Sequence, residues 1–121
     1  MSIQRILVVE DSPTEQFHLR DILVRGGYDV EIAESGERAL ELARNDPPDL
    51  ILMDVVMPGM NGFQATRHFR RDSVLSRIPV ILCSTKSQDT DRVWGLRQGA
   101  NDYLTKPVRE ADLLGRIRAL G

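Results

Sequence analysis

Three apolar runs, each about the length of a β-strand, constrain the fold of this chain more than any other feature. They are residues 6–9 (ILVV), 50–53 (LILM) and 80–83 (VILC). Continuous runs of this kind are typical of parallel strands that helices cover on both faces. Residues 28–33 instead alternate apolar with acidic side chains, which predicts a strand at a sheet edge with one exposed side. Residues 102–105 (DYLT) are a fifth, shorter candidate.

Helical patterns separate these strands. The apolar positions that indicate them are Leu19, Ile22 and Leu23 before Gly26 and Gly27; Ala39, Leu40 and Ala43 after a Ser35 N-cap; and Leu113, Leu114, Ile117 and Leu120. Residues 61–71 and 87–98 fit a helix less regularly. Strand and helix therefore alternate five times, which predicts an α/β fold with a parallel sheet and helices on both faces. We expect residues 1–121 to form a single domain with no output domain.

Composition excludes several classes of protein. The net charge is −2, which gives no whole-chain attraction for nucleic acid, and we interpret the basic cluster Arg67, His68, Arg70 and Arg71 as a solvated helix face. No apolar segment approaches the roughly 20 residues of a membrane span, and the first residues lack the apolar core of a signal peptide. We therefore expect a cytoplasmic protein with no membrane partner. Cys83 lies within the third apolar run and is expected to be a buried small hydrophobe.

Polar residues follow the predicted strands where each one ends. Glu10 and Asp11 come after the first run, Asp54 follows the second, Ser84 the third, and Lys106 the DYLT segment. The carboxyl ends of parallel strands meet at one edge of the sheet, so we expect these side chains to lie close together. Any one acid alone could be an ordinary surface residue. Because several strand ends carry such residues together, a functional site is favoured over isolated surface acids.

Three carboxylates in one crevice repel each other and require positive charge. Lys106 offsets only part of their charge, whereas carboxylate and carbonyl oxygens are suited to Mg²⁺. No His or Cys lies near these positions in the sequence, which argues against zinc or copper. A divalent cation, an ammonium and a hydroxyl are also what a transferring phosphoryl group needs. Asp54, central among them, is the candidate nucleophile that would form an aspartyl phosphate.

Four segments, in this order along the whole chain, resemble the receiver domain of bacterial two-component response regulators. They are VVEDS, LILMDVVMPGMNG, IPVILCST and DYLTKPV. The resemblance implies a flavodoxin-like (βα)5 fold, a doubly wound parallel sheet with the strand order 2-1-3-4-5. It also implies that Asp54 is phosphorylated, that Asp11 binds Mg²⁺ directly and that Glu10 assists through water. The backbone carbonyl of Val56 would complete the protein ligands.

The same resemblance implies roles for the fourth and fifth strands. Lys106 would pair with a phosphoryl oxygen and precede a cis bond to Pro107, Ser84 would hydrogen-bond the phosphoryl group, and Tyr103 would be an aromatic rotamer switch. Expected partners are a histidine kinase of the chemotaxis type and a downstream protein that binds the face near Trp94 and Tyr103.

The helix over residues 87–98 carries Trp94, and its orientation bears on that face. Val93, Leu96 and Ala100 are spaced along one side, which we expect to face the core. Trp94 then points away from the core. It is either a hot spot for a partner or a side chain that packs on a neighbouring helix or lies partly exposed.

The segments DSPTEQ, NGFQATR and VWGLRQGANDYLTKPV further resemble stand-alone receivers of the chemotaxis-like system that controls type IV pili and twitching motility. The expected function is therefore phosphorylation-controlled signalling, through protein binding or as a phosphate sink, by a monomer or weak dimer. Self-phosphorylation and autodephosphorylation would be its only chemistry.

Two other functions compete with signalling. The alternative is a small Mg²⁺-dependent phosphohydrolase with an aspartyl-phosphate intermediate, which would commonly need a second acid where Val55 and Val56 stand. A carrier of flavin mononucleotide is disfavoured, because the loops after Val9 and Met53 are not rich in Ser, Thr and Gly.

Overall fold

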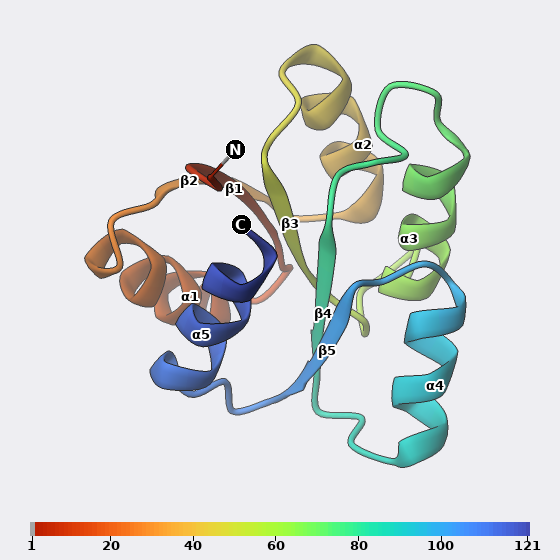
Figure 1. Cartoon of the computed structure of the whole chain (residues 1–121). Helices are drawn as coiled ribbons and strands as arrows, with labels where there is room; N and C mark the ends of the chain where they lie inside the picture. The colour runs from red at the N-terminus through yellow and green to blue at the C-terminus, as the bar shows by residue number, and fades with distance from the viewer. Residues whose placement is uncertain (1) are drawn as a thin grey trace.

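The computed structural model describes residues 2–121 and consists of one parallel sheet with helices on both of its faces (Figure 1). The strands are β1 (Arg5–Val9), β2 (Asp29–Ala33), β3 (Leu50–Asp54), β4 (Val80–Ser84) and β5 (Asp102–Thr105). The helices are α1 (Pro13–Arg25), α2 (Gly36–Asn45), α3 (Gly62–Arg71), α4 (Asp89–Arg97) and α5 (Glu110–Leu120). Every predicted strand and helix is present, within a few residues of its expected bounds.

The strand order is β2-β1-β3-β4-β5, as the resemblance implies. The strand order reverses at β1 and β3, because β2 lies beyond β1 and β4 lies beyond β3. The first two crossovers, through α1 and α2, therefore lie on opposite faces of the sheet. Val9 pairs with Met53 in the register of β1 and β3, and Asp54 pairs with Cys83 in that of β3 and β4. The residues that follow β1 therefore leave the sheet directly beside Asp54.

Two apolar layers cover the sheet. Helices α1 and α5 pack on one face, over the side chains of Ile6, Val8, Leu50, Leu52, Ile81 and Cys83 (Figure 1). Helices α2 and α3 pack on the other face, over Leu7, Val9, Ile51, Met53, Val80 and Leu82. Both faces of the three central strands are thus buried, which explains their uninterrupted apolar runs. The edge strand β2 has the alternating exposure that its sequence predicts.

Side-chain caps hold the starts of three helices. Ser12 accepts a hydrogen bond from the backbone N–H of Glu15, and Ser35 accepts one from that of Arg38. Asn61 and Gln64 form a reciprocal capping box at the start of α3. Because α1, α2 and α3 follow β1, β2 and β3, these caps also fix the loops at the carboxyl edge of the sheet.

Helix α4 does not pack as its sequence predicts. The stripe of Val93, Leu96 and Ala100 was expected to face the core. Ala100 is buried as predicted, but Val93 is 47% exposed and Leu96 45% exposed. The buried residue of α4 is Gly95, whose lack of a side chain lets the helix backbone approach the sheet and turns the longer neighbours outward. Trp94 points away from the core as predicted and is 48% exposed. Helix α4 therefore exposes three large apolar side chains, those of Val93, Trp94 and Leu96.

The basic cluster on α3 is also not a uniformly solvated face. Arg70 is half-buried, and burial lowers the pKa of its guanidinium. Its guanidinium donates to the carbonyl oxygens of Gly99 (2.8 Å), Ser76 (3.3 Å) and Ile78 (2.7 Å), and to the side chain of Asn101 (2.9 Å). The interpretation holds for Arg67, His68 and Arg71, which are exposed. Arg70 instead ties α3 to the loops before β4 and β5.

Replacing Arg70 with Met, which keeps an apolar stem, is expected to lower the free energy of unfolding by about 2–3 kcal/mol, because it leaves partly buried carbonyl oxygens without donors. Chemical denaturation followed by circular dichroism measures this loss. The matched control is Arg71→Met on the same helix turn, expected to change stability by less than about 0.5 kcal/mol. Equal effects from the two variants would mean that the Arg70 hydrogen bonds contribute nothing to stability.

Two further expectations concern burial and membranes. Cys83 is fully buried, and desolvation raises the pKa of its thiol, so it packs as a small hydrophobe. Among residues 2–121, no helix is both long and apolar enough to cross a membrane.

Candidate functional site

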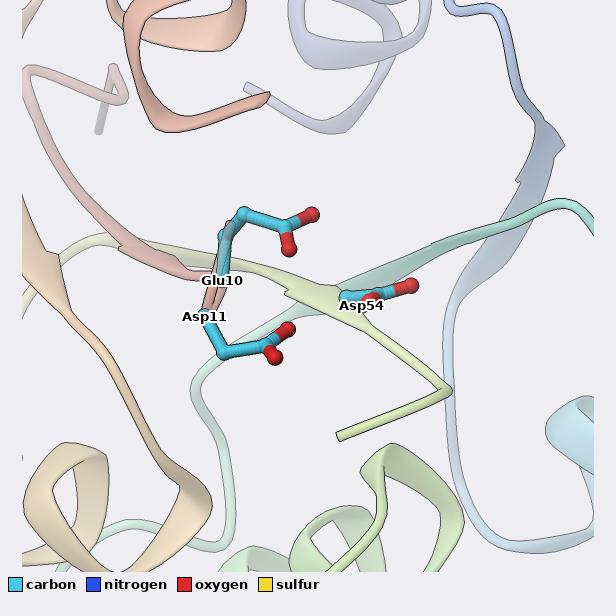
Figure 2. A group of neighbouring side chains, drawn as sticks. All are labelled: Glu10, Asp11 and Asp54. Atoms are coloured by element: carbon cyan, nitrogen blue, oxygen red, sulfur yellow. The ribbon is translucent and has the colours of Figure 1, made fainter. Parts of the chain in front are cut away.

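Three carboxylates meet at the carboxyl edge of the sheet. Figure 2 shows Glu10 and Asp11 leaving the end of β1 beside Asp54 on β3. One oxygen from each carboxylate lies within 4.8 Å of the other two. Glu10 and Asp54 are buried, whereas Asp11 is exposed. The three acids therefore lie together, as their strand-end positions predict, in a cluster that has a buried side and an open side.

Lys106 provides the positive charge on the buried side. Its Nζ atom lies 2.6 Å from Glu10 Oε1 and 3.3 Å from Asp54 Oδ1, with 9% of the side chain exposed. The Oε2 atom of Glu15 lies 3.8 Å from the same Nζ. One ammonium thus stands among four carboxylates, counting Asp11. The group keeps a net negative charge, and Asp11 forms its solvent-exposed side.

Burial and pairing oppose each other in the titration of these groups. Desolvation raises the pKa of the Glu10 and Asp54 carboxyls above their ordinary values, and the contacts with Lys106 counteract only part of this rise. Desolvation lowers the pKa of Lys106, but the hydrogen bond to Glu10 and the charge of Asp54 more than offset it, and the net pKa is raised. Lys106 therefore stays protonated. An additional cation would stabilise the ionised carboxylates further.

Backbone and side-chain hydrogen bonds hold the acids in place. Glu10 Oε2 accepts from the backbone N–H of Ser12 at 3.1 Å, and the Gln16 amide donates to the Glu10 carbonyl at 2.7 Å. The backbone N–H groups of Val56 and Val55 lower the pKa of the Asp54 carboxyl and so offset part of the rise that burial causes. The loop after β1 thus orients the Glu10 carboxylate, and the loop after β3 favours the ionised form of Asp54.

Glu15 and Gln16 are site residues that the sequence reasoning missed. The sequence position of α1 could have indicated them. The helix starts two residues after Asp11, so the side chains of its first turn lie at the same sheet edge as the acids. An acidic residue in the first turn of a helix interacts favourably with the helix dipole. Glu15 can be explained by this role alone, so its sequence position does not indicate that it lies near Lys106.

Ser84 and Tyr103 are linked through the backbone of Lys86. Ser84 is fully buried, and its Oγ accepts from the Lys86 N–H at 3.1 Å. The Tyr103 ring is 1% exposed, and its hydroxyl donates to the Lys86 carbonyl at 2.7 Å. Burial raises the pKa of this phenol. The sequence predicts roles for Ser84 and Tyr103, but it does not show the link between them, because that link runs through the peptide of Lys86 and not through a side chain.

The donor set suits a hard divalent cation. The cluster offers carboxylate oxygens from Glu10, Asp11 and Asp54, without a His or Cys among its members. Asp11 leaves one side open to solvent, and such openness suits Mg²⁺, which keeps several water ligands. Val56 stands two residues after Asp54 with its side chain 54% exposed. The bond between Lys106 and Pro107 is cis, as the resemblance implies.

The fold, the acid cluster with its lysine, and the cis bond together define a receiver. The chain belongs to the family of response regulator receiver domains, which matches residues 6–118. Receiver domains bind Mg²⁺ at their acidic site, and they transmit signals between histidine kinases and downstream targets instead of acting as enzymes in the ordinary sense. This family assignment favours signalling over phosphohydrolase activity.

Three individual proteins are similar to this chain over almost its whole length. PilH of Pseudomonas aeruginosa is 56% identical over 116 residues, which are 96% of each chain. The chemotaxis protein CheY4 of Vibrio cholerae superposes with a TM-score of 0.91 at 29% identity, over 99% of this chain and 100% of the other. The receiver domain of sensor histidine kinase PA1611 of Pseudomonas aeruginosa, solved with a magnesium ion coordinated in its active-site cleft, gives 0.89 at 35% identity, over 98% and 97%.

Proposed function

We propose that this chain accepts a phosphoryl group on Asp54 from a histidine kinase in a Mg²⁺-dependent reaction. The observation that carries the proposal is the position of Asp54, whose carboxylate lies within 4.8 Å of those of Glu10 and Asp11 and 3.3 Å from the ammonium of Lys106. It is the one carboxylate of the cluster that lies on a central strand, at the point where the strand order reverses.

Each residue contributes a separate part of the chemistry. A carboxylate oxygen of Asp54 attacks phosphorus, the bond from phosphorus to the imidazole nitrogen of the kinase breaks, and the imidazole leaves with its electron pair. Lys106, whose Nζ lies 3.3 Å from Asp54 Oδ1, would pair with a phosphoryl oxygen, and the Ser84 hydroxyl would donate a hydrogen bond to another.

Metal binding completes the proposed site. Asp11, Asp54 and the backbone carbonyl of Val56 would hold Mg²⁺, and Glu10 would assist through water. Bound there, Mg²⁺ supplies charge neutralisation for the carboxylates and for the phosphoryl oxygens.

The proposed output is a change in protein binding, with a role as a phosphate sink as its variant. The apolar outer surface of α4, formed by Val93, Trp94 and Leu96, is exposed next to Tyr103 on β5 and suits a protein partner. The similarity to PilH supports a place in the chemotaxis-like control of type IV pilus motility.

The deciding experiment is intact-mass analysis after brief exposure to acetyl phosphate. We expect the protein to gain one phosphoryl group in the presence of Mg²⁺ and none in the presence of a chelator. Equal gain under both conditions would contradict a metal-dependent reaction. No gain in either condition, although Mg²⁺ binds, would contradict phosphoryl uptake from a small donor.

Removing the exposed ligand should weaken metal binding directly. Asp11→Ala is expected to lower Mg²⁺ affinity by about 100-fold, because the cluster loses the carboxylate on its open side. Titration calorimetry or the backbone amide shifts of Ser12 and Val55 measure this without phosphorylation. The matched control is Glu34→Ala, an exposed acid just beyond the carboxyl end of β2 and outside the cluster, which should leave the affinity unchanged. Equal affinity in Asp11→Ala and wild type would remove Asp11 from the ligand set.

A further inference from the structure

Helix α4 contacts the Tyr103 ring through the side chain of Arg92. The guanidinium carbon of Arg92 lies 5.6 Å from the ring centroid, within the range of a cation–π interaction. The Nη1 atom of the same guanidinium donates to the Tyr103 carbonyl oxygen at 2.8 Å. The second contact fixes the first, because a guanidinium anchored to β5 cannot swing into solvent without losing a hydrogen bond. Arg92 thus differs from an ordinary mobile surface arginine.

One helix turn later, Gly95 packs against the edge of the ring. A Cβ atom at Gly95 would lie 3.0 Å from Tyr103 Cδ2 and 3.1 Å from Leu82 Cδ1, so the helix backbone itself packs against the ring. The ring hydroxyl is held by the carbonyl of Lys86. Tyr103 is therefore restrained at its hydroxyl, at its edge and at its face.

A hollow of about 200 Å³ lies beside this arrangement. Its lining includes Arg92, Tyr103, Leu104, Val108 and Arg109. This is the neighbouring space that the ring could enter by rotating outward. Arg92 both covers the buried ring and lines the hollow, so it stands at the boundary between the two positions.

We propose that Arg92 is a positioning residue that holds Tyr103 in its buried position. The inference rests on the proposed function in one respect, the coupling of Tyr103 to the phosphoryl site. That coupling runs through one peptide, since Ser84 accepts from the N–H of Lys86 and Tyr103 donates to its carbonyl. Releasing the ring frees this carbonyl and loosens the segment that positions Ser84. By thermodynamic reciprocity, a residue that favours the buried ring also favours phosphoryl binding.

The test has two readouts on the variants Arg92→Ala, Arg92→Lys and Arg97→Ala. The first is the ¹⁹F resonance of fluorotyrosine at Tyr103, made in a Tyr28→Phe background because the chain has two tyrosines. The second is the affinity for beryllofluoride with Mg²⁺, a phosphoryl mimic, followed by Trp94 fluorescence. Arg97 lies on the same helix, is exposed, and has no ion pair or hydrogen-bonded side-chain partner within residues 2–121, so Arg97→Ala is the matched control.

The expected results separate the inference from the proposed function. Without beryllofluoride, Arg92→Ala should shift or broaden the Tyr103 resonance, Arg92→Lys should restore part of the wild-type signal, and Arg97→Ala should match wild type. Beryllofluoride affinity should fall by about fivefold in Arg92→Ala. A wild-type resonance in Arg92→Ala would overturn the inference whatever the phosphoryl chemistry. A shifted resonance with unchanged affinity would overturn the link to the phosphoryl site. Failure of wild type to bind beryllofluoride would count against the proposed function, while the ring resonance still tests Arg92.

Discussion

Replacement of Asp54 with Asn is expected to abolish phosphoryl uptake from acetyl phosphate while the protein stays folded. The amide keeps the shape of the side chain but lacks the negative charge that makes the carboxylate a nucleophile. Glu10, whose Oε1 lies 2.6 Å from Lys106 Nζ in the wild-type chain, is unchanged in the variant, so the buried ammonium still has a partner. Removing one of several crowded acids also relieves repulsion. Stability should therefore be unchanged or slightly higher, and the loss of uptake cannot be attributed to unfolding.

Intact-mass analysis with Mg²⁺ measures the result, and thermal unfolding confirms that the variant is folded. Asp29→Asn is the matched control, because Asp29 is an exposed acid at the start of β2, away from the carboxyl edge of the sheet. It should gain one phosphoryl group as wild type does. If Asp54→Asn still gained a phosphoryl group at the wild-type rate, the acceptor would be another residue, and peptide mapping would have to locate it.

The sequence predicted the strands and the position of the site for one physical reason. Strands buried on both faces require unbroken apolar runs, and the first polar residue after each run marks where the strand leaves the core. Glu10, Asp54 and Ser84 are found in this way, and the geometry of a parallel sheet then brings them together. The strand order itself came from resemblance, since periodicity says nothing about which strands are neighbours.

The features that the sequence did not predict depend on contacts between distant elements. The spacing of Val93 and Leu96 predicts a buried stripe, but α4 packs through Gly95, and a glycine carries no hydropathy signal. Arg70 belongs to a basic cluster in the sequence, yet its acceptors are carbonyl oxygens on two other loops. In both cases the deciding partner is backbone, and backbone partners cannot be read from side-chain patterns.

The substitution Gly62→Ala is expected to have the largest effect on stability, a loss of about 3 kcal/mol. A Cβ atom at this position would overlap the carbonyl oxygen of Asp54 and lie 2.8 Å from Val55 Cα. Both are backbone atoms, so no side-chain rotation relieves the overlap. The Gly62 N–H also donates to the Val55 carbonyl at 2.9 Å, which fixes the start of α3 against the end of β3. Either α3 moves away from the sheet or the backbone of Asp54 moves.

Gly115→Ala is the control, because it adds the same methyl group at a helix position where no other atom is close. Gly115 lies within α5, and a Cβ atom there would meet nothing within 4 Å, so the substitution should stabilise the protein by about 0.5–1 kcal/mol through helix propensity. Denaturant unfolding should thus give changes of opposite sign for the two variants, and a stabilised Gly62→Ala would contradict the packing described. Because the overlap falls on the backbone of Asp54, Gly62→Ala should also slow phosphoryl uptake in the fraction that remains folded. Gly62 would then be required for the placement of the phosphoryl acceptor as well as for the stability of the fold.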